Sequence, residues 1–124
     1  MNADPPVPVR WIPTPQSLPA GGRGGRAGRL LFTAILTQSG RLEAIYRARG
    51  EAAQHRMVMA LFRGPRAVEV VGSDRDIAAR VGMAPRSVGT GLAFLERTGH
   101  CVRCGRGADR RIRLCLPEAQ EVAP

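Results

Sequence analysis

The sequence predicts one α+β domain that is mostly helical, and three observations support this prediction. Apolar residues recur at helical spacing between residues 30 and 62. Two shorter helical patterns with clear start and stop signals occupy residues 73 to 99. A short, arginine-rich alternating segment follows and is typical of a hairpin. A chain of 124 residues suits one such domain with one modest core.

The two ends of the chain are predicted to be tails, residues 1 to 28 and 119 to 124, around a domain of residues 29 to 118. Six of the ten prolines fall in the first nineteen residues, and a Gly-rich stretch follows. Such a composition buries too little apolar surface to offset its ordering entropy, so the N-terminal tail is expected to be disordered. The stretch from Gly21 to Arg29 carries three arginines and no acid. It is either a flexible arm that adds phosphate contacts or a solvated linker.

The first predicted helix is an additional N-terminal helix at residues 29 to 49. Leu31, Ile35, Leu42 and Ile45 lie on one side of it. Gly40 costs about 1 kcal/mol relative to Ala, so we expect a break or bend there. The apolar face indicates a dimerisation helix, and an ordinary core helix is the alternative.

A second helix is predicted from residue 51 to residue 62. The Gly-Pro pair at residues 64 and 65 is expected to stop it. Residues 66 to 71 then have the pattern of a short strand. Val68 and Val70 fall on one face of that strand, because successive side chains alternate.

The next two helices are predicted from their boundary signals. Ser73 is an N-cap candidate, and Asp76 three residues later makes a weaker form of the capping box. Gly82 ends this helix, since it tolerates positive φ. Pro85 opens the next helix, where a missing N–H costs nothing, and Gly99 closes it.

The helix that begins at Pro85 has two different faces. Its buried stripe comprises Val88, Gly91, Leu92 and Leu95. The opposite stripe is small and polar apart from its arginines, and comprises Arg86, Gly89, Thr90, Ala93 and Arg97. Such a face can lie close against a flat, anionic partner.

The hairpin is predicted to pair residues 102 to 104 with residues 112 to 116 across a Gly-containing tip. From His100 to Leu116 there are five arginines and one acid. Strand alternation places Arg111 and Arg113 on one face and Arg110 on the other. The order helix, helix, strand, helix, helix, hairpin is that of a winged helix-turn-helix, a module that reads DNA.

The charge of the chain agrees with an anionic partner. The formal net charge is +9, and every basic residue is arginine, whose planar fork suits phosphate and guanine. A genome biased toward arginine codons would give the same composition. No apolar run approaches the ~20 residues of a bilayer span, and no secretory signal is visible. Three cysteines, an odd count, favour a reducing compartment, so we expect a cytoplasmic, nucleoid-associated protein.

Residues that could carry other chemistry are few. Four potential zinc ligands lie close together, but Cys101 and Cys104 have opposite strand parity and no second C-x-x-C follows. We therefore expect no metal or other cofactor, and small buried cysteines. A redox switch is the alternative, because flanking arginines would lower a thiol pKa. If the hairpin turns about residue 108, Cys101 lies opposite Cys115. No catalytic triad, P-loop or carboxylate pair is present, so we expect no enzyme.

Three stretches between roughly residues 30 and 118 resemble the MarR family of bacterial transcription regulators. AAQHRMVMALF resembles the segment leading into the family's second helix. DIAARVGMAPRSVGTGLAFLERTGH resembles its helix-turn-helix and recognition helix, and GADRRIRLCLPE resembles its wing. The resemblance implies a homodimeric repressor on a pseudo-palindromic operator in double-stranded DNA. The recognition helix would enter the major groove and the wing arginine the minor groove.

The resemblance and the charge pattern together name the expected DNA-contacting residues. They are Ser73, Pro85, Arg86, Ser87, Gly89, Thr90, Arg103, Arg106, Asp109, Arg110 and Arg111. Arg86 is the candidate for a bidentate contact to guanine. The resemblance further implies that Asp109 orients Arg111.

Two features depart from the family's pattern. Gly89 and Gly91 lie inside the recognition helix and together would weaken it by about 2 kcal/mol. The family's long C-terminal dimerisation helices do not follow the wing, so a dimer would use the helix at residues 29 to 49. A small-molecule effector would lack its usual pocket beneath those helices. The alternative function is a winged-helix protein-interaction or replication-accessory module of a mobile element, which binds DNA without a fixed operator.

Overall fold

A computed structural model describes residues 18–19, 21–40, 45, 47–64 and 66–120. It confirms the predicted α+β, mostly helical class, with a small antiparallel sheet that is compatible with a winged helix. The helices whose bounds fall within the described residues are α1 (Gly25–Gln38), α3 (Glu51–Arg63), α4 (Asp74–Val81), α5 (Pro85–Arg97) and α6 (Pro117–Gln120). The strands are β1 (Glu69–Val71), β2 (Cys101–Cys104) and β3 (Arg111–Leu114), with a short 3-10 turn, η2 (Gly107–Asp109), at the hairpin tip.

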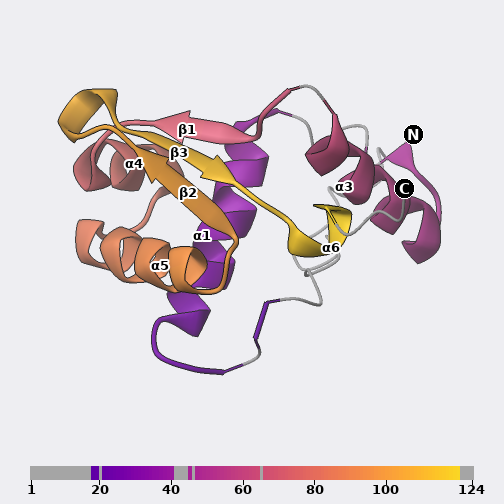
Figure 1. Cartoon of the computed structure of the whole chain (residues 1–124), viewed down its shortest axis with the longest axis horizontal. Coiled ribbons are helices and arrows are strands. Elements are labelled where there is room, and N and C mark those ends of the chain that lie inside the picture. Colours follow the sequence, from indigo (N-terminus) through magenta and orange to yellow (C-terminus); the bar gives the residue numbers. More distant parts are fainter. Residues whose placement is uncertain (1–17, 20, 41–44, 46, 65, 121–124) are drawn as a thin grey trace, which may run out of the picture.

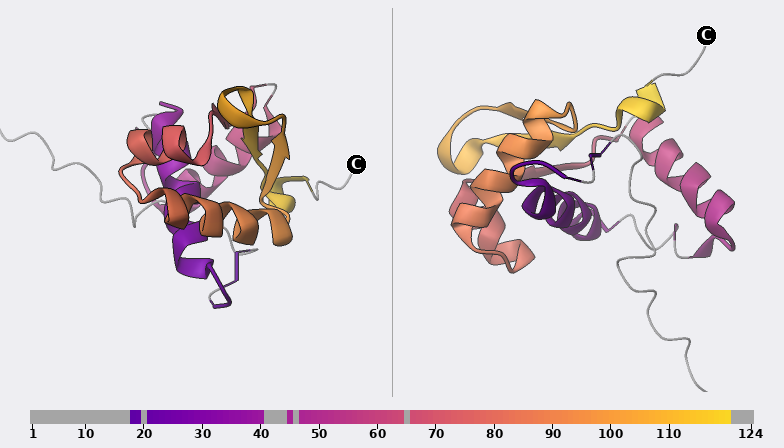
Figure 2. Two further views of the ribbon diagram at one scale, coloured as in Figure 1. Left: turned by 90° about the vertical axis from the view of Figure 1, so that its left-hand side faces the viewer. Right: turned by 90° about the horizontal axis from the view of Figure 1, so that it is seen from below.

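The three strands form a sheet in the order β1-β3-β2 that lies over α1, α4 and α5 (Figure 1). Both strand pairs are antiparallel, with Val70 opposite Ile112 in one and Arg103 opposite Ile112 in the other. The hairpin tip, α4 and the beginning of α5 lie at one end of the molecule, and α3 and α6 lie at the other (Figures 1 and 2). The two ends therefore offer separate surfaces.

The boundaries of α4 and α5 follow the predicted signals. Ser73 accepts a hydrogen bond from the Asp76 amide, and the Asp76 carboxylate accepts one from the Ser73 amide, which completes a capping box. Gly82 ends α4 with φ +73°, and Pro85 is the first residue of α5. The Gly99 amide donates to the Glu96 carbonyl at the end of α5, so this stop is also confirmed.

The predicted N-terminal tail extends too far into the chain. Helix α1 begins at Gly25, not at residue 29, and Leu18 is buried. The prediction failed because the glycines that indicate a linker are here packing residues: Gly25 and Gly28 are buried against α5. Residues 1–17 and 20 of the predicted tail lie outside the described residues.

Helix α1 ends at Gln38, and Gly40 has φ +72°, so the predicted break at this glycine is confirmed. The prediction that the apolar face of residues 29 to 49 forms a dimer interface is wrong for the residues that can be checked. Leu31, Ile35 and Ile45 are 0%, 1% and 1% exposed because they fill the core of their own chain. Leu42 lies outside the described residues.

Two glycines allow α1 and α5 to pack closely. A Cβ on Gly28 would lie 2.3 Å from Cδ2 of Phe94, and a Cβ on Gly91 would lie 2.9 Å from the carbonyl oxygen of Ala27. Both approaches are too close for a side chain. Gly91 therefore weakens α5 as a helix but is required where α1 crosses it.

The helix outside the winged-helix-like body is α3, whereas the sequence predicted an additional helix at the N-terminus. Helix α1 packs chiefly on α5, and α3 packs chiefly on α6. The end of α3 still touches α1, since the rings of Phe62 and Phe32 stack with centroids 5.8 Å apart. The predicted C-terminal tail also begins too early, because α6 continues to Gln120 and Ala119 is buried. Residues 121–124 lie outside the described residues.

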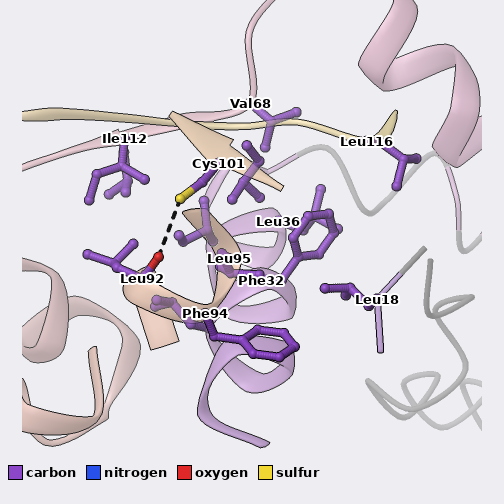
Figure 3. Close-up of a cluster of buried hydrophobic side chains, with 14 of the residues drawn as sticks. Leu18, Phe32, Leu36, Val68, Leu92, Phe94, Leu95, Cys101, Ile112 and Leu116 are labelled. Carbon is purple, nitrogen blue, oxygen red and sulfur yellow. Dashed lines mark hydrogen bonds between the residues drawn. The ribbon is translucent and has the colours of Figure 1, made fainter. Parts of the chain in front are cut away.

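The core lies where α1, α5 and the inner face of the sheet meet (Figure 3). Leu92 and Leu95 of α5 are fully buried, and so is Ile112 of β3. His100 is also fully buried, and its Nδ1 lies 2.8 Å from the Thr98 hydroxyl. In the described part of the chain, no helix combines the length and apolar character needed to cross a membrane.

Candidate nucleic-acid interface

The predicted faces of α5 are confirmed. Val88, Gly91, Leu92 and Leu95 are buried, and Arg86, Thr90, Ala93 and Arg97 are exposed, whereas Gly89 of the predicted exposed stripe is half-buried. The C-terminal end of the exposed stripe is partly used within the chain, because Arg97 donates to the Arg23 carbonyl at 2.9 Å and lies over the Phe94 ring. The first two turns of α5 remain open.

Those two turns hold five of the predicted DNA-contacting residues. Pro85, Arg86 and Thr90 are exposed, and Ser87 and Gly89 are half-buried. The Thr90 hydroxyl donates to the Arg86 carbonyl at 3.0 Å, so it faces back along its own helix. Arg86 therefore carries the charge of this surface.

Ser73 has a structural role in the capping box, whereas the sequence predicted it as a DNA contact. Its hydroxyl donates to the Asp76 carboxylate at 2.9 Å and accepts from the Asp76 amide at 3.2 Å. These hydrogen bonds from Ser73 hold the pKa of Asp76 below its ordinary value. The hydroxyl donates and accepts within the chain, so a contact to DNA would have to compete with the capping box.

Arg103 and Arg110 are paired with carboxylates of this chain. Arg103 donates from Nε and Nη2 to the two carboxylate oxygens of Glu96, at 2.9 and 2.7 Å. These bonds hold the pKa of Glu96 below its ordinary value. Arg110 Nη2 donates to Asp74 Oδ1 at 2.7 Å. A phosphate would have to compete with these carboxylates for either guanidinium, which the sequence did not predict.

The expected pairing of Asp109 with Arg111 is absent from the described part of the chain. Asp109 ends the exposed turn η2, and Arg111 points to the exposed face of β3. The arginine beside Arg111 that pairs with an acid is Arg110, and its partner is Asp74 of α4. Strand alternation explains the difference, because Arg110 and Arg111 point to opposite faces as predicted.

Three of the predicted arginines form no side-chain hydrogen bond or ion pair among the described residues: Arg86, Arg106 and Arg111. Arg113 shares the exposed face of β3 with Arg111 and has only a distant contact, 3.9 Å from Glu69. Arg86 is the second residue of α5, and Arg106 and Arg111 flank η2 at the hairpin tip. The start of α5 and the hairpin tip lie at the same end of the molecule (Figure 1). Arg86, Arg106 and Arg111 together define what we call the basic end.

The N-terminal glycine-rich segment, for which the sequence left a flexible arm and a linker open, borders the start of α5. An open groove of about 480 Å³ separates the start of α1 from the turn before α5. Arg26 and Leu30 line one side, and Met83, Ala84 and Ser87 line the other. Arg26 is exposed there, so it adds a positive charge to the groove at the start of α5. The Gly/Arg composition was the available signal, but it also fits a linker.

The three cysteines differ in exposure: Cys101 is buried, Cys115 is half-buried and Cys104 is exposed. Cys101 lies opposite Leu114, so the predicted pairing of Cys101 with Cys115 is wrong by one residue because η2 shifts the turn. Burial raises the pKa of the Cys101 thiol to about 11 and raises the pKa of Cys115. Desolvation outweighs the arginine charges, contrary to the lowered pKa of the redox-switch alternative. No cluster of three or more His, Cys, Asp or Glu ligands occurs among the described residues.

We expect Cys101 to resist alkylation at pH 8 in the folded protein, while the exposed Cys104 reacts with iodoacetamide. The raised pKa leaves almost no Cys101 thiolate at that pH, and the fold excludes the reagent. Because the folded pKa lies above the ordinary 9.0, the fold should lose stability as pH rises from 9 toward 11. Peptide mass mapping with and without urea checks the first point, and equal labelling of Cys101 in both would contradict it.

No protein-family model matches this chain, and no curated protein or solved structure matches it either.

Proposed function

We propose that this chain is a winged helix-turn-helix protein that binds specific sites in double-stranded DNA and regulates transcription as a repressor. The observation that carries the proposal is the basic end. Arg86, Arg106 and Arg111 gather at one end of the molecule without carboxylate partners in the described part of the chain. A duplex supplies the anionic surface that such a set lacks.

The two elements of the basic end suit different parts of a duplex. The open first turns of α5 are narrow and bear small residues next to Arg86, so this helix can enter a major groove. The hairpin is thin, with Arg106 and Arg111 exposed near its tip, and can follow the backbone into the adjacent minor groove. Arg86 would select a base, and the wing would add affinity.

The resemblance to MarR regulators supports this function through α4, α5 and the hairpin alone. The segment AAQHRMVMALF corresponds to α3, and α3 packs chiefly on α6. The helix that packs most extensively against α5 is α1 instead. A homodimer on a palindromic operator remains part of the proposal because two recognition helices one DNA turn apart would double the contacts. Its interface would have to lie outside the buried residues Leu31, Ile35 and Ile45.

The test is a footprint of the full chain on DNA upstream of its own gene, compared with scrambled DNA of equal length. We expect a protected site and an affinity that falls steeply between 50 and 200 mM salt, on the order of tenfold or more, because arginines displace counterions from phosphate. Binding that is insensitive to salt would contradict the proposal. Salt-sensitive binding with equal affinity for both DNAs would favour the alternative module without a fixed operator.

A further inference from the structure

One arginine of the hairpin turns away from the basic end and into the body of the chain. Arg110 Nη2 donates to Asp74 Oδ1 at 2.7 Å, and its Nε donates to the Gly72 carbonyl at 3.0 Å. The backbone adds a third bond, because the Gly72 amide donates to the Arg110 carbonyl at 2.8 Å. The Arg110 side chain is only 13% exposed. These bonds fasten the hairpin next to its tip to the segment that leads into α4.

The same carboxylate also lies against α5. A Cβ on Gly89 would stand 3.0 Å from Asp74 Oδ2, so only glycine leaves Asp74 its full space at this point. Asp74 is the first residue of α4, where a negative charge is favoured by the free N–H groups of the helix. The carboxylate therefore lies between the hairpin and the recognition helix and touches both.

The hydrogen bonds of Arg110 constrain the angle between the hairpin and α4 as well as the distance between them. A guanidinium is planar, and two of its N–H groups are bound here to acceptors on different residues, Gly72 and Asp74. A lysine ammonium has three donors but no fixed plane and sits on a flexible stem, so it would not impose an orientation. Arg110 thus holds the plane of the hairpin in one orientation relative to α4.

The position of Arg110 gives this constraint a consequence for binding. Arg111 is the next residue and points to the opposite, exposed face of β3. Fixing Arg110 therefore fixes where Arg111 is presented. Arg86 is fixed on the other side of the same contact, because it lies on α5 one turn before Gly89.

We propose that Arg110 and Asp74 are positioning residues that set the hairpin at a defined distance and angle from α5. Arg111 and Arg86 can then engage one duplex together, and Arg110 itself makes no contact with DNA. The proposal deepens the DNA-binding function above and rests on it. It replaces the expectation that Arg110 binds DNA directly.

The first test needs no DNA. Hydrogen–deuterium exchange is measured on the full chain, on Arg110→Gln and, as a matched control, on Arg103→Gln, which removes another arginine–carboxylate pair from the same hairpin. We expect amides of Gly72 and the hairpin tip to exchange at least tenfold faster in Arg110→Gln, with the core of α5 unchanged. The exposed Arg103 pair should matter little for these amides. Unchanged exchange at Gly72 in Arg110→Gln would overturn the proposal.

The second test is a double-mutant cycle on operator DNA. If Arg110 positions the hairpin, Arg111→Ala should cost less than twofold once Arg110→Gln or Asp74→Asn is present, whereas Arg86→Ala keeps its full effect. If Arg110 binds phosphate itself, its loss and that of Arg111 should multiply, and Asp74→Asn should strengthen binding by releasing Arg110. Losses that multiply, or stronger DNA binding by Asp74→Asn, would each overturn the proposal.

The two tests separate the two claims. If the unaltered protein binds no duplex DNA, the proposed function fails, and the exchange experiment still decides whether Arg110 holds the hairpin. If the protein binds DNA and the exchange at Gly72 is unchanged, only the positioning role fails.

Discussion

Replacing Arg86 by alanine is expected to abolish base preference at one position of the operator while most non-specific affinity remains. Arg86 is exposed in the first turn of α5 and has no side-chain partner in the described part of the chain, so it can reach a base edge. A bidentate arginine–guanine contact is worth about 1–3 kcal/mol of discrimination. Affinities of the variant for the operator and for operators changed at single positions measure the effect.

Arg111→Ala is the matched control for that experiment, since it removes the same side chain from the hairpin. A minor groove offers a degenerate pattern and a negative potential, so this loss should weaken binding evenly across sequences. The dependence of log affinity on log salt should flatten by about 0.9, the share of one phosphate contact. If Arg86→Ala weakened operator and scrambled DNA equally, α5 would not read bases, and the module without a fixed operator would be the better account.

The parts of this fold that could be predicted are those whose causes are local in the chain. Ser73 and Asp76 cap α4 through bonds that span three residues. Pro85 and Gly99 bound α5 because of the backbone conformations that proline and glycine favour. Each signal acts within one helical turn, so the sequence alone contains it.

The N-terminal boundary could not be predicted because its cause is a distant contact. A glycine-rich stretch is typical of a linker, and nothing near Gly25 or Gly28 distinguishes it from a close helix crossing. The partner that decides between them is Phe94, which lies on α5, far along the chain from both glycines. The same holds for Gly91, whose cost as a helix residue was visible while its packing role against Ala27 was not.

In the candidate site, alternation predicted directions but not partners. It placed Arg111 and Arg113 on the exposed face of β3 and Arg110 on the other, as observed. It could not indicate that the Asp74 carboxylate would accept a hydrogen bond from Arg110. These residues are 36 positions apart and meet only when the hairpin folds over α4. A charge count of the hairpin therefore overestimates the number of its arginines that lack a carboxylate partner in the described part of the chain.

The largest loss of stability is expected from Gly28→Ala. Its Cβ would lie 2.3 Å from Cδ2 of Phe94, whose ring is 1% exposed and has no room to withdraw. Overpacking of this kind typically costs about 1–3 kcal/mol, and a contact this short favours the upper part of that range. Alanine would return only about 1 kcal/mol as the better helix former. Because a domain of this size has only about 5–15 kcal/mol of stability, the change should lower the urea midpoint clearly.

Gly25→Ala is the matched control, because it makes the same chemical change in the same helix. Its Cβ would meet Arg29 Nη1 at 3.3 Å and Phe94 Cε1 at 3.5 Å, and the arginine end can move aside. We expect its free energy of unfolding to stay within about 0.5 kcal/mol of the unaltered protein. Adding Phe94→Leu to Gly28→Ala should recover part of the lost stability, since a smaller side chain relieves the overlap. Urea titrations of the four proteins followed by circular dichroism test this. If Gly28→Ala and Gly25→Ala unfolded at the same midpoint, α1 would not cross α5 at Gly28, and the first helix of the domain would have to lie elsewhere.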